Sequence, residues 1–207
     1  MKLVQGAKEL GPRFDEAFNY AARMHSGQAR KGKTVPYIAH LMSVSSIVLE
    51  AGGHEDAAIA ALLHDVVEDC GGTPVLREVE QKFGSKVAKI VEGCTDSFED
   101  PKPPWKQRKE SYILRLKTED DETRLVSASD KLDNSRAILM DYRDQGETIW
   151  KRFQGGREGT LWYYRALLEE FQRRPLNRVT AELGRVVTIL EKLTNENTGA
   201  DGKAFVK

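Results

Sequence analysis

The sequence predicts an all-α fold, a helical bundle that forms a single domain. Apolar residues recur three and four positions apart along most of the 207 residues, which is the spacing of amphipathic helices. No segment of useful length alternates apolar and polar residues as a half-buried strand would. No stretch rich in Pro, Gly or Ser is long enough to divide the chain. One domain is therefore expected over residues 1–193, and the polar, glycine-bearing tail over 194–207 is expected to be disordered.

The first three helices are expected over residues 14–24, 41–51 and 55–68. A basic loop with two glycines, residues 27–36, follows the first helix and should stay near the surface. The second helix ends at a glycine pair. The third is nearly apolar through its middle, so it should be buried, and its polar end at His64 must then be satisfied by partners.

Six further helices are expected, and Pro and Gly set their boundaries. Proline near the first position opens the fourth helix, and Gly84 separates it from the fifth. A proline-rich loop over 101–104 precedes the sixth, and the pair Gly155-Gly156 lies between the long seventh helix and the eighth. These six helices are expected over residues 73–83, 86–93, 105–117, 121–142, 158–173 and 176–193.

Composition argues against several classes of protein. Lys+Arg and Asp+Glu both number 32, so the chain lacks the basic surplus of a general nucleic-acid binder. Cys70 and Cys94 form no CxxC pair, which argues against a zinc ribbon and suits a reduced, cytoplasmic protein. The N-terminus begins no secretory signal, and no run approaches the roughly 18 apolar residues of a membrane span. We expect a cytoplasmic protein without nucleic-acid or membrane partners, and leave open whether it forms a homo-oligomer.

The segment over residues 61–69, Ala-Leu-Leu-His-Asp-Val-Val-Glu-Asp, is the most informative part of the chain. On a helix, His64 lies one turn from Glu68 and Asp65 lies one turn from Asp69, so three carboxylates and an imidazole would share about two turns. Carboxylates this close repel one another unless a cation neutralises them. The segment therefore predicts a bound divalent metal ion with an active site around it.

Two more metal ligands are predicted from other helices. His40 begins the second helix and His64 ends the third, and two successive antiparallel helices would bring these ends together. Asp130 is the best candidate for a further acidic ligand because the stretch before it, residues 126–129, is weakly polar and can be buried. Two imidazoles and two carboxylates suit a first-row transition ion, with manganese, iron and cobalt all open at this point.

Other polar residues near these ligands are candidates for catalysis and substrate binding. Glu68 and Asp69 lie one turn beyond the ligands and can orient or deprotonate a water molecule. Asn134 lies one turn after the acidic ligand and can hydrogen-bond a substrate, while the pair Arg30-Lys31 supplies positive charge from the basic loop. The site is therefore expected to take a small phosphate-bearing molecule.

These residues and their surroundings resemble the hydrolase domain of the RelA/SpoT alarmone enzymes and its stand-alone forms, the small alarmone hydrolases and the metazoan SpoT homologue. His40, His64-Asp65 and Asp130 match the metal-binding pattern of the HD-domain phosphohydrolases. The resemblance covers residues 14–173, and the motifs that carry it are residues 21–31, 36–40, 64–69, 83–84, 95–96 and 130–134.

The resemblance implies that the single domain predicted above is a helical bundle of the HD-domain type. It implies Mn²⁺ held by the two histidines and two aspartates, a nucleophilic water handled by Glu68 and Asp69, and nucleotide contacts from Arg30, Lys31 and Asn134. The implied reaction removes the 3′-pyrophosphate of (p)ppGpp, or of its adenosine counterpart (p)ppApp, to give GDP or GTP (ADP or ATP) plus pyrophosphate.

Three departures from the family leave the nucleotide open, including guanine versus adenine. Leu41 follows His40, where the family commonly has Pro. Residues 31–36 lack the acidic residue often found after the lysine, and residues 155–165 differ from the family's usual sequence. None of these changes touches the predicted metal ligands.

Two other interpretations stay open. An HD phosphohydrolase of other specificity, such as a nucleotidase, a dNTPase or an NADPH phosphatase, would keep the same metal ligands. A non-catalytic nucleotide sensor would use the same pocket only to bind, although it has no need of the acid pair Glu68-Asp69.

Several other polar and aromatic residues are expected to have structural rather than chemical roles: His25 near a helix end, His54 exposed at a helix start, Thr95-Asp96 in a cap or turn, Lys106, Arg108 and Lys109 on a solvated helix face, Asp133 on the surface, and Tyr163 and Tyr164 in core packing. Lys131 is open between a phosphate ligand and a surface charge.

Overall fold

The computed structural model describes residues 9–98, 101–175 and 177–200. Within these ranges the chain forms ten α-helices, one 3₁₀-helix and no β-strand, which confirms the all-α prediction. In chain order the elements are α1 (Pro12–Met24), α2 (Ile38–Glu50), α3 (Glu55–Leu63), α4 (Val66–Cys70), α5 (Thr73–Phe83), α6 (Ser85–Cys94), α7 (Trp105–Leu116), α8 (Asp121–Gln145), the 3₁₀-helix η1 (Gly146–Arg152), α9 (Gly156–Phe171) and α10 (Arg178–Ala200).

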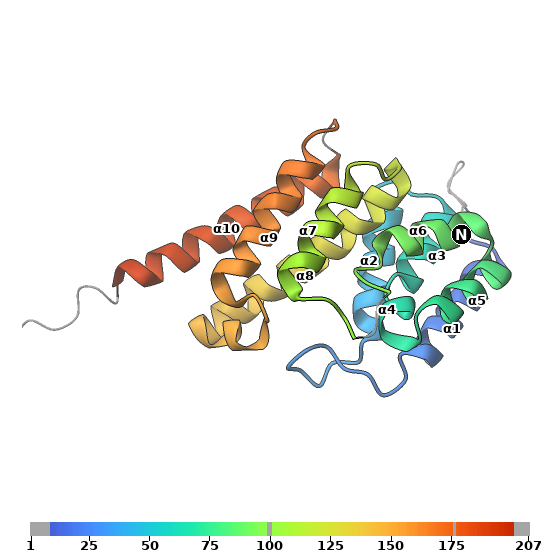
Figure 1. Ribbon diagram of the computed structural model, residues 1–207, viewed down its shortest axis with the longest axis horizontal. Coiled ribbons are helices and arrows are strands. Elements are labelled where there is room, and N and C mark those ends of the chain that lie inside the picture. The colour runs from blue at the N-terminus through green and yellow to red at the C-terminus, as the bar shows by residue number, and fades with distance from the viewer. Residues whose placement is uncertain (1–8, 99–100, 176, 201–207) are drawn as a thin grey trace, which may run out of the picture.

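Helix α8 is the central element of the bundle, in contact with α2, α3, α6, α10 and η1. Figure 1 shows α7 and α8 between the N-terminal helices α1–α6 and the pair α9 and α10. Two hydrophobic cores result. Val126 belongs to the core of the N-terminal helices, whereas Ala128 and Leu132 belong to the core shared with α7, α9 and α10. The two cores therefore meet on α8 between Val126 and Ala128, within one turn of Asp130.

Helix α3 is buried on all sides, as its apolar composition predicts. Residues 57–63 are each no more than 1% exposed. The polar residues that follow must therefore find their partners inside the protein.

The helix expected over 55–68 is interrupted, and this prediction of one continuous helix was wrong. α3 ends at Leu63 and α4 begins at Val66, with His64 and Asp65 between them. The Nδ1 of His64 donates to the carbonyl of Ala61 (2.8 Å), the acceptor that residue 65 would use in a continuous helix. On a regular helix, adjacent side chains point about 100° apart. The interruption instead lets His64 and Asp65 converge on one point.

The last helix is longer than predicted. α10 runs to Ala200, beyond the expected end at residue 193. Thr194 is fully buried, and its carbonyl accepts from the guanidinium of Arg157 (2.9 Å) on α9. This packing carries the helix through a polar stretch that suggested a tail, while residues 201–207 of that expected tail lie outside the described residues.

The 3₁₀-helix η1 was not predicted, although Ile149 and Trp150 bury their side chains there. In the part of the chain that the structure describes, no helix combines the length and apolar character needed to cross a membrane.

Candidate active site

Three separate segments bring His40, His64, Asp65 and Asp130 together. His40 lies in the first turn of α2, the His64-Asp65 pair lies between α3 and α4, and Asp130 lies midway along α8. His64 Nε2 is 3.1 Å from Asp65 Oδ2, and His40 Nε2 is 3.2 Å from Asp130 Oδ1. The cross distances, His64 to Asp130 and His40 to Asp65, are 3.6 and 3.7 Å. Two atoms about 2.1 Å from one ion lie about 3.0 to 3.4 Å apart at right or tetrahedral angles, so the spacing suits shared ligation.

The two imidazoles are oriented as metal ligands are. His40 Nδ1 lies 2.6 Å from Asp133 Oδ2, and His64 Nδ1 donates to the Ala61 carbonyl. Both Nε2 atoms are buried, and neither has a hydrogen-bond partner among the described residues. Metal-binding histidines commonly use one ring nitrogen for such a donation and keep the other lone pair for the ion. His40, His64 and Asp65 thus form a group that can hold a divalent metal ion, with Asp130 beside it.

The aspartates of the candidate metal centre favour positive charge on its two histidines. Burial alone would lower the pKa of both imidazoles, but Asp130 raises the pKa of His40 and Asp65 raises that of His64 well above its usual value. Burial likewise opposes ionisation of Asp130, yet the Lys131 ammonium and the two imidazoles hold its pKa well below the usual range. The centre therefore collects protons when no other cation is bound.

Asp133 is not a surface residue as the sequence suggested, and that prediction was wrong. Besides facing His40, its carboxylate accepts from the hydroxyl of Ser43 and lies 3.8 Å from Arg30 Nη2. On a helix, positions three and four apart share a face, so Asp133 flanks Asp130 as Asn134 does. The three-residue spacing between Asp130 and Asp133 could therefore have predicted that Asp133 lies beside the metal centre.

Lys131 is a buried cation rather than a surface charge. Its side chain is 14% exposed, and Nζ lies 2.5 Å from Asp130 Oδ2 and 4.9 Å from the ring centre of Tyr112. The neighbouring carboxylate outweighs burial and raises the pKa of the ammonium. Lys131 therefore stays charged at the inner wall of the adjoining pocket.

Glu68 and Asp69 take different positions on the short helix α4. Glu68 lines the pocket and accepts from Lys102 Nζ (2.8 Å). Asp69 is exposed, and its Oδ2 accepts from the side-chain amide of Gln28 (2.8 Å). A residue that the sequence analysis did not single out, Tyr37, donates to Asp65 Oδ2 (2.5 Å) from the end of the basic loop.

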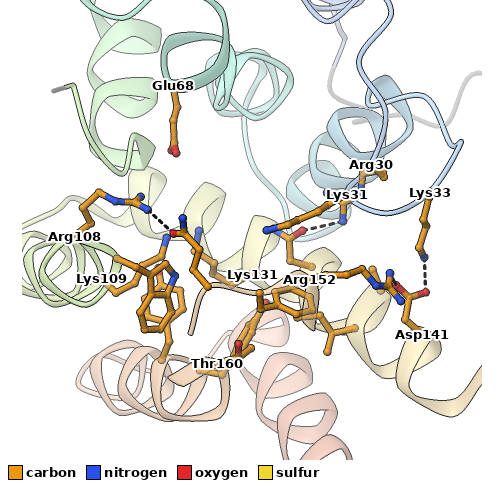
Figure 2. A pocket seen from close by; sticks show the side chains of 18 of the residues that line it. Arg30, Lys31, Lys33, Glu68, Arg108, Lys109, Lys131, Asp141, Arg152 and Thr160 are labelled. Atoms are coloured by element: carbon orange, nitrogen blue, oxygen red, sulfur yellow. Dashed lines mark hydrogen bonds and ion pairs between the residues drawn. The ribbon is translucent and has the colours of Figure 1, made fainter. Parts of the chain in front are cut away.

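A pocket of about 390 Å³ adjoins this centre. Its lining is Arg30, Lys31, Lys33, Tyr37, Glu68, Trp105, Arg108, Lys109, Lys131, Asn134, Ala137, Ile138, Asp141, Arg152, Phe153, Gln154, Thr160, Tyr163 and Tyr164. In Figure 2, Glu68 points into this space, with Arg108 and Lys109 at one end of the view and Lys33 and Arg152 at the other. Cations outnumber carboxylates in the lining seven to two although the whole chain is neutral, so the pocket suits an anionic ligand.

The basic loop is attached to the wall of the pocket. Arg30 Nη2 donates to Asn134 Oδ1 (2.8 Å), and Lys31 Nζ lies 5.7 Å from the ring centre of Phe153. Lys33 pairs with Asp141 (2.6 Å). The predicted substrate residues Arg30, Lys31 and Asn134 therefore face one cavity although they come from segments about a hundred residues apart.

Two of the three cations expected on a solvated face of α7 are not solvated, which corrects that prediction. Arg108 and Lys109 line the pocket, and both pair with the buried carboxylate of Asp96, Lys109 at 3.1 Å. Burial lowers the pKa of Lys109. Lys106 alone faces outward, 3.7 Å from Glu110.

The indole of Trp105 forms part of the pocket wall and rests on two glycines of the segment that differs from the family. A Cβ at Gly155 would lie 2.6 Å from this ring, and one at Gly159 would lie 3.2 Å from it. Because glycine has no side chain, the indole of Trp105 can pack directly against the backbone at both positions.

Other expectations of structural roles agree with the structure. His25 follows α1 as its C-terminal cap, and His54 is an exposed residue at the start of α3. Tyr163 and Tyr164 are buried in the second core, and both also reach the pocket.

Comparison with known proteins identifies related chains. The family model described as HD domain matches residues 17–161. The mouse protein named guanosine-3′,5′-bis(diphosphate) 3′-pyrophosphohydrolase MESH1 is 39% identical over 170 residues, which cover 75% of this chain and 92% of the mouse protein. An Aquifex aeolicus protein named guanosine-3′,5′-bis(diphosphate) 3′-pyrophosphohydrolase is 32% identical over 153 residues. That match covers 72% of this chain but only 21% of the bacterial protein.

A solved structure described as a metazoan ortholog of SpoT that hydrolyzes ppGpp has the same fold. It superposes with a TM-score of 0.71 at 30% identity, covering 87% of this chain and 96% of the other. The fold is therefore shared over most of both chains.

Proposed function

The chain belongs to the HD domain family, and from this premise we propose that it is a Mn²⁺-dependent hydrolase of guanosine or adenosine alarmones. It removes the 3′-pyrophosphate of (p)ppGpp or (p)ppApp, leaving GDP or GTP (ADP or ATP) and pyrophosphate. The mouse and Aquifex relatives are named for this reaction on the guanosine compound. The chain spans only about a fifth of the Aquifex protein. The proposed activity of this chain is therefore argued from the residues of its own site.

One observation carries the proposal: two bare, buried imidazole nitrogens and two aspartates meet beside a strongly cationic pocket in a neutral chain. His40, His64, Asp65 and Asp130 would hold the ion. A divalent cation there supplies charge that neutralises a phosphate oxygen and lowers the pKa of water. The adjoining cations select a substrate with several phosphates.

Different residues of the chain would then activate the water and bind the nucleotide. Glu68, which points into the pocket, and Asp69 beside it orient the attacking water and take its proton. The water oxygen forms a bond to the phosphorus that carries the 3′ oxygen, the bond between that phosphorus and the 3′ oxygen breaks, and the proton passes to the 3′ oxygen, which leaves as a hydroxyl. Arg30 and Lys31 contact the nucleotide, with Arg30 able to stack on a purine, and Asn134 hydrogen-bonds it.

The same proposal includes the setting in which the protein acts. Its partner is a small nucleotide, not a nucleic acid or a membrane, and its location is the cytoplasm. The zero net charge of the chain and the concentration of cations inside one cavity support a small anionic partner. Homo-oligomer formation is compatible with it.

The test is a substrate panel. Purified protein with Mn²⁺ is incubated separately with ppGpp, ppApp, a dNTP, a nucleoside monophosphate and NADPH, and released pyrophosphate or phosphate is measured. We expect pyrophosphate from at least one alarmone. Turnover confined to the other compounds would indicate an HD phosphohydrolase of different specificity. Nucleotide binding without any turnover, with Mn²⁺ confirmed bound, would indicate a sensor and reject the proposal.

A further inference from the structure

His25, which caps α1, and Gln28, in the loop that follows, form a hydrogen-bonded chain that reaches Asp69. The Nδ1 of His25 lies 2.7 Å from Oε1 of Gln28, and Nε2 of Gln28 donates to Oδ2 of Asp69 (2.8 Å). His25 is 3% exposed, whereas Asp69 lies at the surface of α4. The chain therefore connects a fixed, buried ring to an exposed carboxylate that belongs to the proposed catalytic pair.

The direction of each hydrogen bond follows from the donor and acceptor types. An ionised carboxylate only accepts, so the side-chain nitrogen of Gln28 must face Asp69. The amide oxygen then faces His25, and because oxygen accepts, Nδ1 of His25 must carry the ring proton. The opposite amide orientation would place two oxygens at hydrogen-bond distance. The tautomer of His25 with a proton on Nδ1 thus sets the orientation of the Gln28 amide. The amide nitrogen in turn holds Oδ2 of Asp69 in place.

Gln28 is also held through its backbone. Its N–H donates to the carbonyl of His25 (3.0 Å), and its carbonyl accepts from the N–H of Tyr37 (2.9 Å). The ring of Tyr37 stacks on that of His25, with 5.0 Å between ring centres and 25° between planes. Tyr37 in turn donates to Asp65. The stacked pair therefore supports hydrogen bonds to Asp65, a metal ligand, and to Asp69.

α4 spans only Val66–Cys70, so the helix alone provides little to restrain an exposed aspartate. A freely rotating carboxylate would spend much of its time out of reach of a water beside the metal centre. We propose that Gln28, locked by His25, is a positioning residue that holds the Asp69 carboxylate in its working orientation. This inference rests on the proposed function, in which Asp69 handles the attacking water.

The kinetic test compares Gln28→Met, which keeps the length of the side chain but loses both hydrogen bonds, with Gln81→Met, an exposed glutamine on α5. We expect kcat for alarmone hydrolysis to fall about 10- to 100-fold in Gln28→Met, less than the roughly 100- to 10,000-fold that a positioned acid–base group contributes, because the Asp69 carboxylate itself is still present. KM, Mn²⁺ affinity and melting temperature should stay at wild-type values, and Gln81→Met should be unaffected. A wild-type kcat in Gln28→Met, or a loss explained by KM, metal affinity or unfolding, overturns the positioning role.

A second measurement separates this inference from the proposed function. Nitrogen-15 NMR of labelled histidine, with diamagnetic Zn²⁺ in the site and His25→Gln used for assignment, reports which ring nitrogen is protonated. We expect Nδ1–H for His25 in the wild type and a shift toward Nε2–H in Gln28→Met. An Nε2–H tautomer in the wild type overturns the hydrogen-bonded chain whatever the activity. Absence of alarmone turnover by the wild type rejects the proposed function instead.

Discussion

Nδ1 of His40 and Oδ2 of Asp133 lie 2.6 Å apart, which joins the first turn of α2 to the middle of α8 directly behind the candidate metal centre. The contact leaves Nε2 of His40 free of hydrogen bonds among the described residues and directed at the aspartates of the centre. A carboxylate in this position fixes the ring and makes it a better electron donor. Asp133 thereby connects the metal site to Arg30 of the substrate loop, 3.8 Å away.

Replacing Asp133 should weaken metal binding. We expect Asp133→Ala to lower Mn²⁺ affinity about 10- to 100-fold, because the His40 ring loses its partner and its preferred tautomer. Isothermal titration of the metal-free protein with Mn²⁺ measures this directly. Asp144→Asn, an exposed aspartate on the same helix, is the matched control and should bind as the wild type does. Equal affinities for Asp133→Ala and the control would contradict the role assigned to Asp133.

Metal binding should compete with protons near neutral pH. Neighbouring carboxylates outweigh burial and raise the pKa values of His40 and His64 in the metal-free protein, so each ring keeps its proton above the usual titration range near pH 6.5. A divalent ion needs the unprotonated rings. Mn²⁺ affinity should therefore rise as pH increases from 6 to 8. Binding should release protons, measured as a dependence of the apparent enthalpy on buffer ionisation; an affinity that stays constant across this interval would contradict the prediction.

The position of the Trp105 indole should change when a single methyl group is added at Gly155. Gly155→Ala places a Cβ 2.6 Å from the indole, so the ring must move away from the pocket wall. We expect KM for the nucleotide to increase several-fold, by about 1 kcal/mol of binding free energy. Gly184→Ala is the control, because its Cβ would meet only Leu168 at 3.8 Å and the helix should gain stability. An unchanged KM in Gly155→Ala would show that the indole does not shape the substrate site.

Local spacing predicts much of this fold because helices are short-range structures. The interval of apolar residues and the positions of Gly84 and the prolines place α5 and α6 within two residues of their observed ends. The same spacing does not predict the interruption at His64. That feature depends on the ring of His64 binding the Ala61 carbonyl, which the apolar pattern of the segment does not reveal.

The candidate site likewise has parts that the sequence predicts and parts that it does not. The positions of His40 and His64 at the ends of successive helices are enough to bring them together, since the connection between the helices is short. The inward direction of Arg108 and Lys109 is different, because it depends on the rotation of α7 about its own axis. Trp105 at the start of α7 packs on Gly155 and Gly159, about fifty residues later, and no local pattern records that contact.

The helix that carries the site should depend on its N-terminal cap. Asp120 precedes α8, and its Oδ1 accepts from the backbone N–H of Thr123 (2.9 Å) while Lys89 lies 2.8 Å from Oδ2. We expect Asp120→Ala to lower the free energy of unfolding by about 1 kcal/mol, because an N–H of the first turn loses its acceptor. Asp120→Asn keeps an acceptor for this N–H and removes only the charge of the carboxylate, so it should lose less. Equal losses in the two variants would contradict the capping role.

Part of the stability that Asp120 confers should also be lost in acid. Although burial raises its pKa, the hydrogen bonds from Lys89 and from Thr123 lower it from 3.8 to about 2. A carboxylate whose pKa is lower in the folded state stabilises fully above the unfolded value and loses its effect as pH falls through the folded one. Denaturant unfolding at several pH values should therefore show that the difference between wild type and Asp120→Ala is constant above about pH 5 and shrinks as the pH falls toward about 2. A difference that stays constant through this interval would mean that the ionised carboxylate is not what α8 gains from its cap.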